Sequence, residues 1–463
     1  MNRKEELFLE KIEFIGNIND ERIFVDNLQF EVYYSLLNRS KITGKIFGTN
    51  ENYKTLINLI NSSASYLNLI AEFDDEIISS SKLSLRGISG KDTSRDPKDR
   101  MNFEIGRFEL LDLKIVHSFN SESKKRIITY FLDGPHDVWN VRKTIEKNDS
   151  GEYYDHFQKL YFDIDNDFLI YITQRVFSES DNTDTSNFDI STNKYILTVE
   201  TELPIEILSD DCFIEKSKSI CDDLLLLSSY LSKSWIDWYG YYLSSSNSIV
   251  KFFQKSRDVE HKTIYPDKFP INIYKNKKFF DKSIKSLNDS NFDIRMALTY
   301  FIASQKSKHV EEQFTTLFLS LEKLKDSFAL QRKLSKNLSD KDFKKLRSKI
   351  SALIETEIVE NDILDEIKIK LPELNRPSVK TVLFNLFSEL DITWKDIYPK
   401  DSDFTLIKTR DTLFHSSSKI EIDIIISEVI RLEILLDRII LKLLGWNDLS
   451  QVKKEYHNSW LLH

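Results

Sequence analysis

The sequence predicts an α+β protein with more than one domain, in which a β-rich N-terminal part precedes a helical C-terminal part. Short runs with alternating apolar residues, or with β-branched and aromatic residues, dominate the first half of the chain. In the second half apolar residues recur at helical spacing. The length of 463 residues exceeds what one ordinary hydrophobic core organises, so we expect two or three domains.

Strand patterns define the N-terminal part. Four segments show them most clearly, and polar stretches separate one from the next. These segments are residues 107–117, 126–132, 160–173 and 195–202. We expect a sandwich or a curled sheet, and we assign residues 1–211 to a β-rich recognition or regulatory domain.

Helical patterns begin soon after residue 211. Residues 221–242 are rich in leucine and aromatic residues, and we predict one helix there. Pro266 and Pro270 interrupt any longer helix, so we expect residues 212–288 to be a helical connector. Residues 289–463 are expected to form an all-α bundle. Its predicted helices are residues 292–308, 310–330, 341–357, 362–371, 379–390, 403–415 and 420–444.

The last predicted helix is apolar almost all round, so we expect burial on more than one side, either inside a bundle or at an oligomer interface. Eight charged residues lie between residues 420 and 446, a density that excludes an ordinary membrane span. No apolar signal segment follows the N-terminal residues. We therefore expect a cytoplasmic protein without a membrane partner.

Composition excludes several classes of function. The chain has only 10 glycines and neither a P-loop nor a dinucleotide-binding fingerprint, which argues against ATPase and dinucleotide chemistry. Cys212 and Cys221 cannot form a four-thiolate zinc site, and the histidines lack metal-ligand spacing. We expect no cofactor and no metal.

Charge is unevenly distributed along the chain. The net charge of −9 argues against a general polyanion binder. Residues 251–286, however, carry ten basic residues against four acidic ones, and residues 332–349 carry eight against two. These two basic islands indicate either local attraction of an anion or solvated helix faces.

One short segment combines residue types that carry chemistry. Arg410 is followed by Asp411 and, five positions after the arginine, by His415. No other arginine in the chain has a histidine five to seven positions downstream. The segment ends a predicted helix and directly precedes the most apolar one, within a domain predicted to be entirely helical.

These residues resemble the signature of the HEPN ribonuclease superfamily: an arginine, then Asn, His or Asp, then three to five residues and a histidine. The resemblance covers about residues 289–450. The predicted helix around residues 314–324 is similar to an early HEPN helix that ends in an acidic residue, here Glu322. The whole chain resembles ApeA-type bacterial antiphage proteins, through residues 130–135 and the predicted helix at 224–241.

The resemblance implies an endoribonuclease that needs no metal and acts as an abortive-infection effector, with RNA (tRNA among the candidates) as substrate and a phage protein as trigger. It implies Arg410 and His415 as the catalytic pair, with Asp411 and Glu322 in support. Histidine can move protons near neutral pH, and a guanidinium can hold a phosphate at two points. It also implies a homodimer or a higher symmetric oligomer formed through the HEPN domain.

The spacing of the catalytic pair leaves two arrangements open. Residues five apart on a straight helix differ by about 140° and do not share a face. Arg410 and His415 therefore converge if the helix frays at its end, or if two chains each contribute a set to one groove.

Two rival functions remain open. One is a catalytically inactive helical protein that binds a partner or RNA through the last helix and the basic islands. The other is a metal-dependent nuclease that uses Asp112, Glu122 and Lys124 in the β-rich part. A polar turn at Glu122 and Lys124 argues against the second.

Overall fold

The structure is a computed structural model, and the description covers most of the chain. Clustering of contacts divides the chain into two compact units, of which the first comprises Met1–Ser228 and Trp235–Thr263 and the second comprises Ser229–Ser234 and Ile264–His463. The described residues are 9–20, 23–35, 42–62, 66–73, 75–92, 103–119, 124–134, 137–147, 153–183, 186–255, 269–334, 336–358, 360–398, 404–415, 420–449 and 452.

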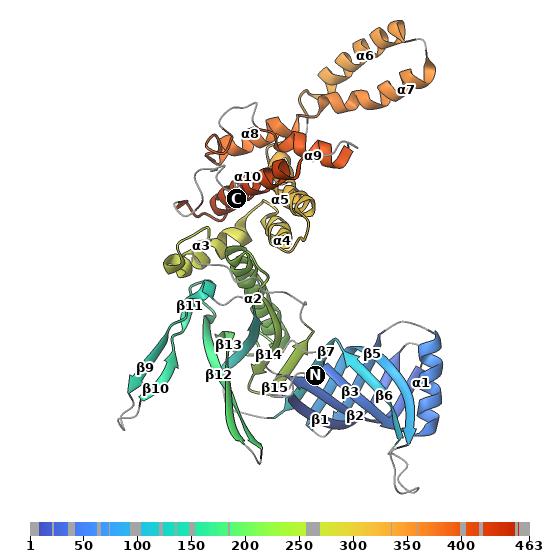
Figure 1. The fold of residues 1–463 in the computed structure, drawn as a ribbon, viewed down its shortest axis with the longest axis vertical. Coiled ribbons are helices and arrows are strands. Elements are labelled where there is room, and N and C mark those ends of the chain that lie inside the picture. The colour runs from blue at the N-terminus through green and yellow to red at the C-terminus, as the bar shows by residue number, and fades with distance from the viewer. Residues whose placement is uncertain are drawn as a thin grey trace. The chain divides into compact units, whose positions relative to one another are not determined.

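A closed antiparallel barrel forms the beginning of the first unit (Figure 1). Its strands are β1 (Leu9–Asp20), β2 (Ile23–Ser35), β3 (Ile42–Gly48), β4 (Leu67–Phe73), β5 (Glu76–Asp92) and β6 (Phe103–Leu110). Neighbours pair in the order β4-β1-β2-β3-β6, and the barrel closes because the 17-residue β5 pairs with both β4 and β6. Alternate side chains, including Phe14, Phe30 and Phe108, fill the interior. Helix α1 (Asn50–Ser62) adds Leu56 to this core.

The sheet continues beyond the barrel. Its further strands are β7 (Asp112–Ser118), β8 (Arg126–Asp133), β11 (Leu160–Phe162), β12 (Leu169–Thr183), β13 (Ser186–Thr201), β14 (Asp237–Ser244) and β15 (Ser248–Gln254). They follow the order β11-β12-β13-β8-β14-β15-β7, and β7 joins the barrel by pairing with β5. Strands β9 (Lys143–Lys147) and β10 (Tyr153–Phe157) form a separate hairpin. The predicted segments 107–117 and 160–173 each contain two strands with a turn between them, not one strand.

Helix α2 (Asp210–Ser232) covers part of this sheet. Tyr130 of β8 lies within hydrogen-bonding distance of Ser217, with 2.9 Å between their oxygens. The indole nitrogen of Trp139, in the short helix η2 (Asp137–Trp139), donates to Ser228 at 3.0 Å, and that of Trp238 donates to Asp222 at 2.9 Å. Hydrogen bonds that involve Tyr130, Trp139 and Trp238 thus hold α2 against the sheet.

The expectation of one helix over residues 221–242 is wrong in its second half. The helix ends at Ser232, Lys233 adopts a left-handed conformation with φ of 49°, and β14 begins at Asp237. Because β14 pairs with β8 on one side and β15 on the other, its aromatic residues become the centre of a sheet. Residues 212–288, expected to be a helical connector, therefore contain two strands that belong to the β-rich unit.

The second unit is helical. Its elements are η4 (Ile273–Lys275), α3 (Asn276–Asp289), α4 (Ile294–Ser304), α5 (Val310–Gln331), α6 (Asp340–Glu357), α7 (Asn361–Lys370), η5 (Leu371–Asn375), α8 (Val379–Glu389), α9 (Leu406–His415) and α10 (Ile422–Leu443). The helices predicted from residue 292 onward are confirmed within a few residues at each end. A β-rich N-terminal region followed by a helical C-terminal region is likewise confirmed. None of the described helices is both long and apolar enough to cross a membrane.

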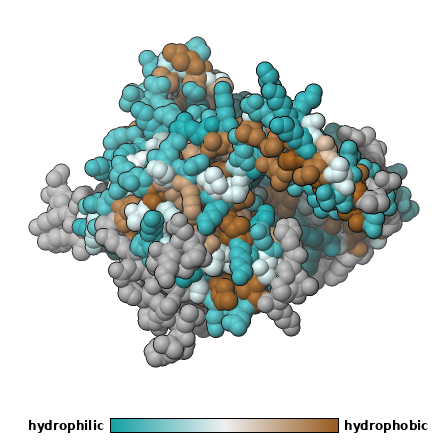
Figure 2. Space-filling model, turned by 90° about the horizontal axis from the view of Figure 1, so that it is seen from above, coloured by the Kyte–Doolittle hydropathy of each residue, from teal (hydrophilic) through white to brown (hydrophobic). Residues whose placement is uncertain are grey.

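Helix α10 lies in the core of this unit, whereas α6 lies outside any core. Leu432, Leu436 and Ile439 of α10 are fully buried. No residue of the 18-residue α6 is buried. Leucine and isoleucine side chains of α6 and of its neighbour α7 remain exposed, among them Leu353. Helices α6 and α7 lie at the top of Figure 1. In the view from above, hydrophobic residues lie at the surface among hydrophilic ones (Figure 2).

Candidate functional site

Arg410 lies where helices α9 and α5 meet in the second unit. Its guanidinium donates to Asp411 with 2.8 Å between Nη1 and Oδ1. A second nitrogen, Nη2, lies 3.5 Å from Oε1 of Glu322 on α5. Three of the four residues expected to form the site are therefore in contact, although Glu322 is 88 positions away from Arg410 in the sequence.

Aromatic rings contact the same guanidinium. Its central carbon lies 5.7 Å from the ring centre of Phe318 and 5.6 Å from that of Phe414. Phe318 is buried, whereas Phe414 is about half exposed. Cation–π attraction and the two carboxylates hold the arginine in place. The Arg410 side chain remains 30% exposed, so solvent and solutes can reach it.

His415 is the last residue of α9, and its side chain lies outside the described residues. The backbone of α9 is helical through this position, so the helix does not end before it. Positions 410 and 415 of this helix therefore lie about 140° apart around its axis. Of the two arrangements open from the sequence, this favours the one in which two chains contribute.

A buried carboxylate anchors the start of α9 to α10. Glu428 is 1% exposed and accepts hydrogen bonds from Tyr398 at 2.7 Å, from Thr405 at 2.6 Å and from Arg431 at 2.8 Å. Burial, together with the neighbouring Glu428 carboxylate, raises the pKa of Tyr398 well above its usual value. Because Thr405 directly precedes α9, this network positions the helix that carries Arg410.

The metal-dependent alternative finds no cluster in the described part of the chain, where no group of three or more His, Cys, Asp or Glu side chains could hold a metal ion. Asp112 accepts hydrogen bonds from the side chain of Ser80 and the backbone of Ser81, both at 2.8 Å, which gives it a structural role at a strand end. Glu122 lies outside the described residues.

Sequence patterns missed the partners that support the site. Phe318, Phe414 and Glu428 were not among the expected site residues. One signal was present: an acidic residue inside the most apolar helix must be paired if it is buried, and Glu428 is such a residue. The two phenylalanines carry no comparable signal, because phenylalanine is common on packed helix faces.

Comparison with family models, with curated proteins and with solved structures found no match to this chain. The site is therefore interpreted from its own geometry. Its central feature is an arginine that is partly open to solvent, held by two carboxylates and two aromatic rings, on a helix that ends in a histidine.

Proposed function

We propose that the helical unit is a metal-independent endoribonuclease of the HEPN type, with Arg410 and His415 as its catalytic pair. The observation that carries the proposal is the contact of Arg410 with both Glu322 and Asp411. These are the residues that the resemblance assigns to supporting roles, and they come from two separate helices. A coincidental Arg-Asp-x-x-x-His string would not require an acidic residue of α5 at the guanidinium.

The reaction needs only groups that this chain and the RNA supply. The ribose 2′-oxygen attacks the neighbouring phosphorus, a new P–O2′ bond forms, and the P–O5′ bond breaks. One histidine accepts the 2′-hydroxyl proton, and a proton is delivered to the departing 5′-oxygen. Arg410 would hold the phosphate oxygens and offset the charge that develops in the transition state. The requirement for a 2′-hydroxyl restricts the reaction to RNA.

Two copies of the chain make this scheme complete. Because positions 410 and 415 lie about 140° apart around the axis of α9, the two positions do not share one side of the helix. A twofold dimer through the helical unit would bring two sets to one groove, so that one histidine could act as base and the other as acid. We infer a homodimer, or a larger symmetric assembly, as the active form.

The resemblance further leads us to propose an abortive-infection effector. In that scheme the enzyme stays inactive until a phage protein is sensed, and it then cleaves cellular RNA, with tRNA a candidate substrate. The β-rich unit would be the recognition or regulatory part. This biological role rests on the resemblance alone, whereas the chemistry rests also on the geometry at Arg410.

The test is cleavage of RNA in the presence of EDTA. We expect products that end in 2′,3′-cyclic phosphate and 5′-hydroxyl groups, and we expect Arg410→Ala and His415→Ala each to reduce cleavage by at least about a hundredfold. Lys408→Ala is the matched control, because Lys408 is an exposed cation on the same helix. Cleavage that EDTA abolishes, or that survives in His415→Ala, would contradict the proposal.

A regulated enzyme can be silent without its trigger, so growth provides a second readout. Overexpression is expected to arrest growth, and Arg410→Ala is expected to restore it. Arrest that persists in both Arg410→Ala and His415→Ala would show that another part of the chain is responsible.

A second candidate is binding of RNA or a partner without cleavage. Helix α6 favours it, because the basic residues Lys344, Lys345, Arg347 and Lys349 are all exposed there. Neutralising them would then abolish RNA binding, whereas His415→Ala would leave every activity unchanged. For the proposed enzyme, the His415 variant loses activity and keeps its binding.

A further inference from the structure

Two cations lie directly opposite each other on the outer surface of the barrel. Lys45 of β3 and Arg107 of β6 are register partners in the β3–β6 ladder. Like charges directly opposite on one face of a sheet destabilise the ladder. Among the residues that the structure describes, no acidic side chain forms an ion pair with either of them. Glu31 is the partner of Lys45 in the β2–β3 ladder. Its carboxylate instead accepts a hydrogen bond from Tyr33 and forms an ion pair of 3.3 Å with Lys11.

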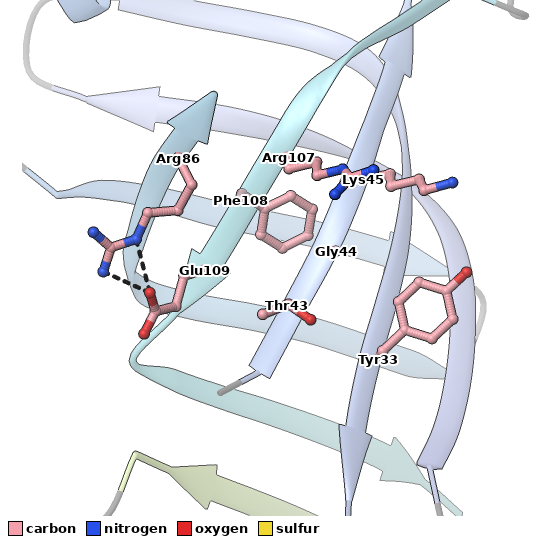
Figure 3. A pocket seen from close by; sticks show the side chains of 8 residues that line it. All are labelled: Tyr33, Thr43, Gly44, Lys45, Arg86, Arg107, Phe108 and Glu109. Atoms are coloured by element: carbon pink, nitrogen blue, oxygen red, sulfur yellow. Dashed lines mark hydrogen bonds and ion pairs between the residues drawn. The ribbon is translucent and has the colours of Figure 1, made fainter. Parts of the chain in front are cut away.

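A cavity of about 600 Å³ opens at this pair. Figure 3 shows Lys45 and Arg107 side by side, Tyr33 on the next strand, and Arg86 beside Glu109. All of the lining residues belong to β2, β3, β5 and β6, so they form one continuous surface of the barrel. They are Tyr33, Thr43, Gly44, Lys45, Arg86, Arg107, Phe108 and Glu109.

The buried carboxylate of Glu109 binds Arg86, a third cation that lines the cavity. Glu109 is 2% exposed, and Nε of Arg86 donates to it at 2.7 Å. Lys255, just after β15, donates to its other oxygen at 3.1 Å. Hydrogen bonds from Lys255 and Arg86 outweigh the effect of burial and keep the pKa of Glu109 below its usual value. Glu109 is thus satisfied by these two partners, and among the described residues it forms no ion pair with Lys45 or Arg107.

From this arrangement we propose that the barrel cavity binds a phosphate-bearing ligand of nucleotide size. Lys45 and Arg107 would contact the phosphate from two strands, with Arg107 able to contact two oxygens at once. The hydroxyls of Tyr33 and Thr43 are further polar groups in the lining. The phosphate would also reduce the repulsion between the two cations.

The size of the cavity favours a small ligand over a nucleic-acid strand. Cavities for small molecules usually measure about 300–1,000 Å³, and this one falls inside that range. A strand would need a basic groove that continues past the cavity, and beyond Lys45 the same register row instead carries Glu31 and Glu13. The inference is independent of the proposed ribonuclease, because all of these residues belong to the other unit.

The test is calorimetric titration of the full chain with inorganic phosphate, with AMP and with a tri-adenylate that carries only phosphodiesters. We expect AMP to bind, and we expect Lys45→Ala and Arg107→Ala each to weaken it about tenfold or more. Lys82→Ala is the matched control, an exposed cation on β5 that does not line the cavity. Stronger binding of the tri-adenylate than of AMP, lost in the same two variants, would assign the phosphate to a strand.

Thermal unfolding separates a ligand site from a structural role. AMP should raise the melting temperature of the wild-type chain but not that of Lys45→Ala. Without ligand, Lys45→Ala should melt close to the wild-type temperature, because the variant removes both the repulsion from Arg107 and the attraction of Glu31. Binding of none of the three probes, or binding that both alanine variants retain, would overturn the proposal. So would a marked loss of stability in unliganded Lys45→Ala.

Discussion

Lys233 and Asp437 form an ion pair of 3.2 Å in the interior of the helical unit. The hydroxyl of Tyr230 donates to the same carboxylate at 3.0 Å. Burial lowers the pKa of Lys233, but the carboxylates of Asp437 and Glu433 outweigh it and raise the pKa overall. The pair links Lys233, which directly follows α2, to Asp437 in α10.

Removing one partner of this pair should be costly. Asp437→Ala leaves the Lys233 ammonium with only the more distant Glu433, at 3.9 Å, as counter-charge, and we expect the free energy of unfolding to fall by about 3 kcal/mol. The double variant Lys233→Met with Asp437→Leu should lose much less. Urea unfolding measures both. Lys336→Met, in an exposed pair with Asp340, is the control and should change the free energy by less than about 0.5 kcal/mol.

Gly44 and Gly87 test how tightly the barrel is packed. A Cβ at Gly44 would collide with the backbone oxygen of Glu31 and with the ring of Phe108, whereas a Cβ at Gly87 would meet nothing within 4 Å. We expect Gly44→Ala to destabilise the protein by about 1–3 kcal/mol and Gly87→Ala to be neutral or slightly stabilising. Thermal unfolding decides, and equal effects of the two variants would contradict the packing described for β3 and β6.

Glu109 should make the barrel sensitive to acid. A carboxyl whose pKa is lowered by folding stabilises the protein above its unfolded pKa of about 4.3, and that contribution disappears as the pH falls through the lowered folded value. Glu109→Gln lacks this contribution. The difference in melting temperature between wild type and Glu109→Gln should therefore be largest near pH 7 and shrink toward pH 3. Glu72→Gln, at an exposed position of β4, should melt like the wild type throughout.

Glu322 is expected to position Arg410 without touching the RNA. Glu322→Gln weakens one contact of the guanidinium, and we expect RNA cleavage to fall about tenfold with the same cyclic-phosphate products. Per folded enzyme, the loss should appear in kcat rather than in KM, which a mere loss of RNA affinity would not produce. Glu311→Gln, an exposed acid in the first turn of the same helix, should cleave normally.

Local patterns predicted the helical unit well and the sheet only in part. Helices α4 to α10 follow from apolar spacing, which is a local signal. The strand at 237–244 was mistaken for helix because its aromatic residues are compatible with both structures. The segment forms a strand because it pairs with β8, which lies more than a hundred positions earlier in the chain. Closure of the barrel through β5 is equally non-local.

The candidate functional residues, too, could be predicted from the sequence only in part. The resemblance grouped Arg410, Asp411 and Glu322 in one site, and the structure places them in contact. Their chemical role remains a prediction. The cavity at Lys45 and Arg107 could not be predicted, because it requires the register of β3 against β6, which no pattern within either strand reveals.

The barrel uses one uninterrupted stretch of chain, Leu9 to Leu110. During synthesis it can therefore close as soon as that stretch has left the ribosome. The adjoining sheet must wait, because β14 and β15 lie between β8 and β7 and end only at Gln254. Until they arrive, β7 and β8 lack the strands that separate them. The nascent protein should therefore pass through an intermediate with a finished barrel and an open sheet, the stage at which chaperones would be needed most.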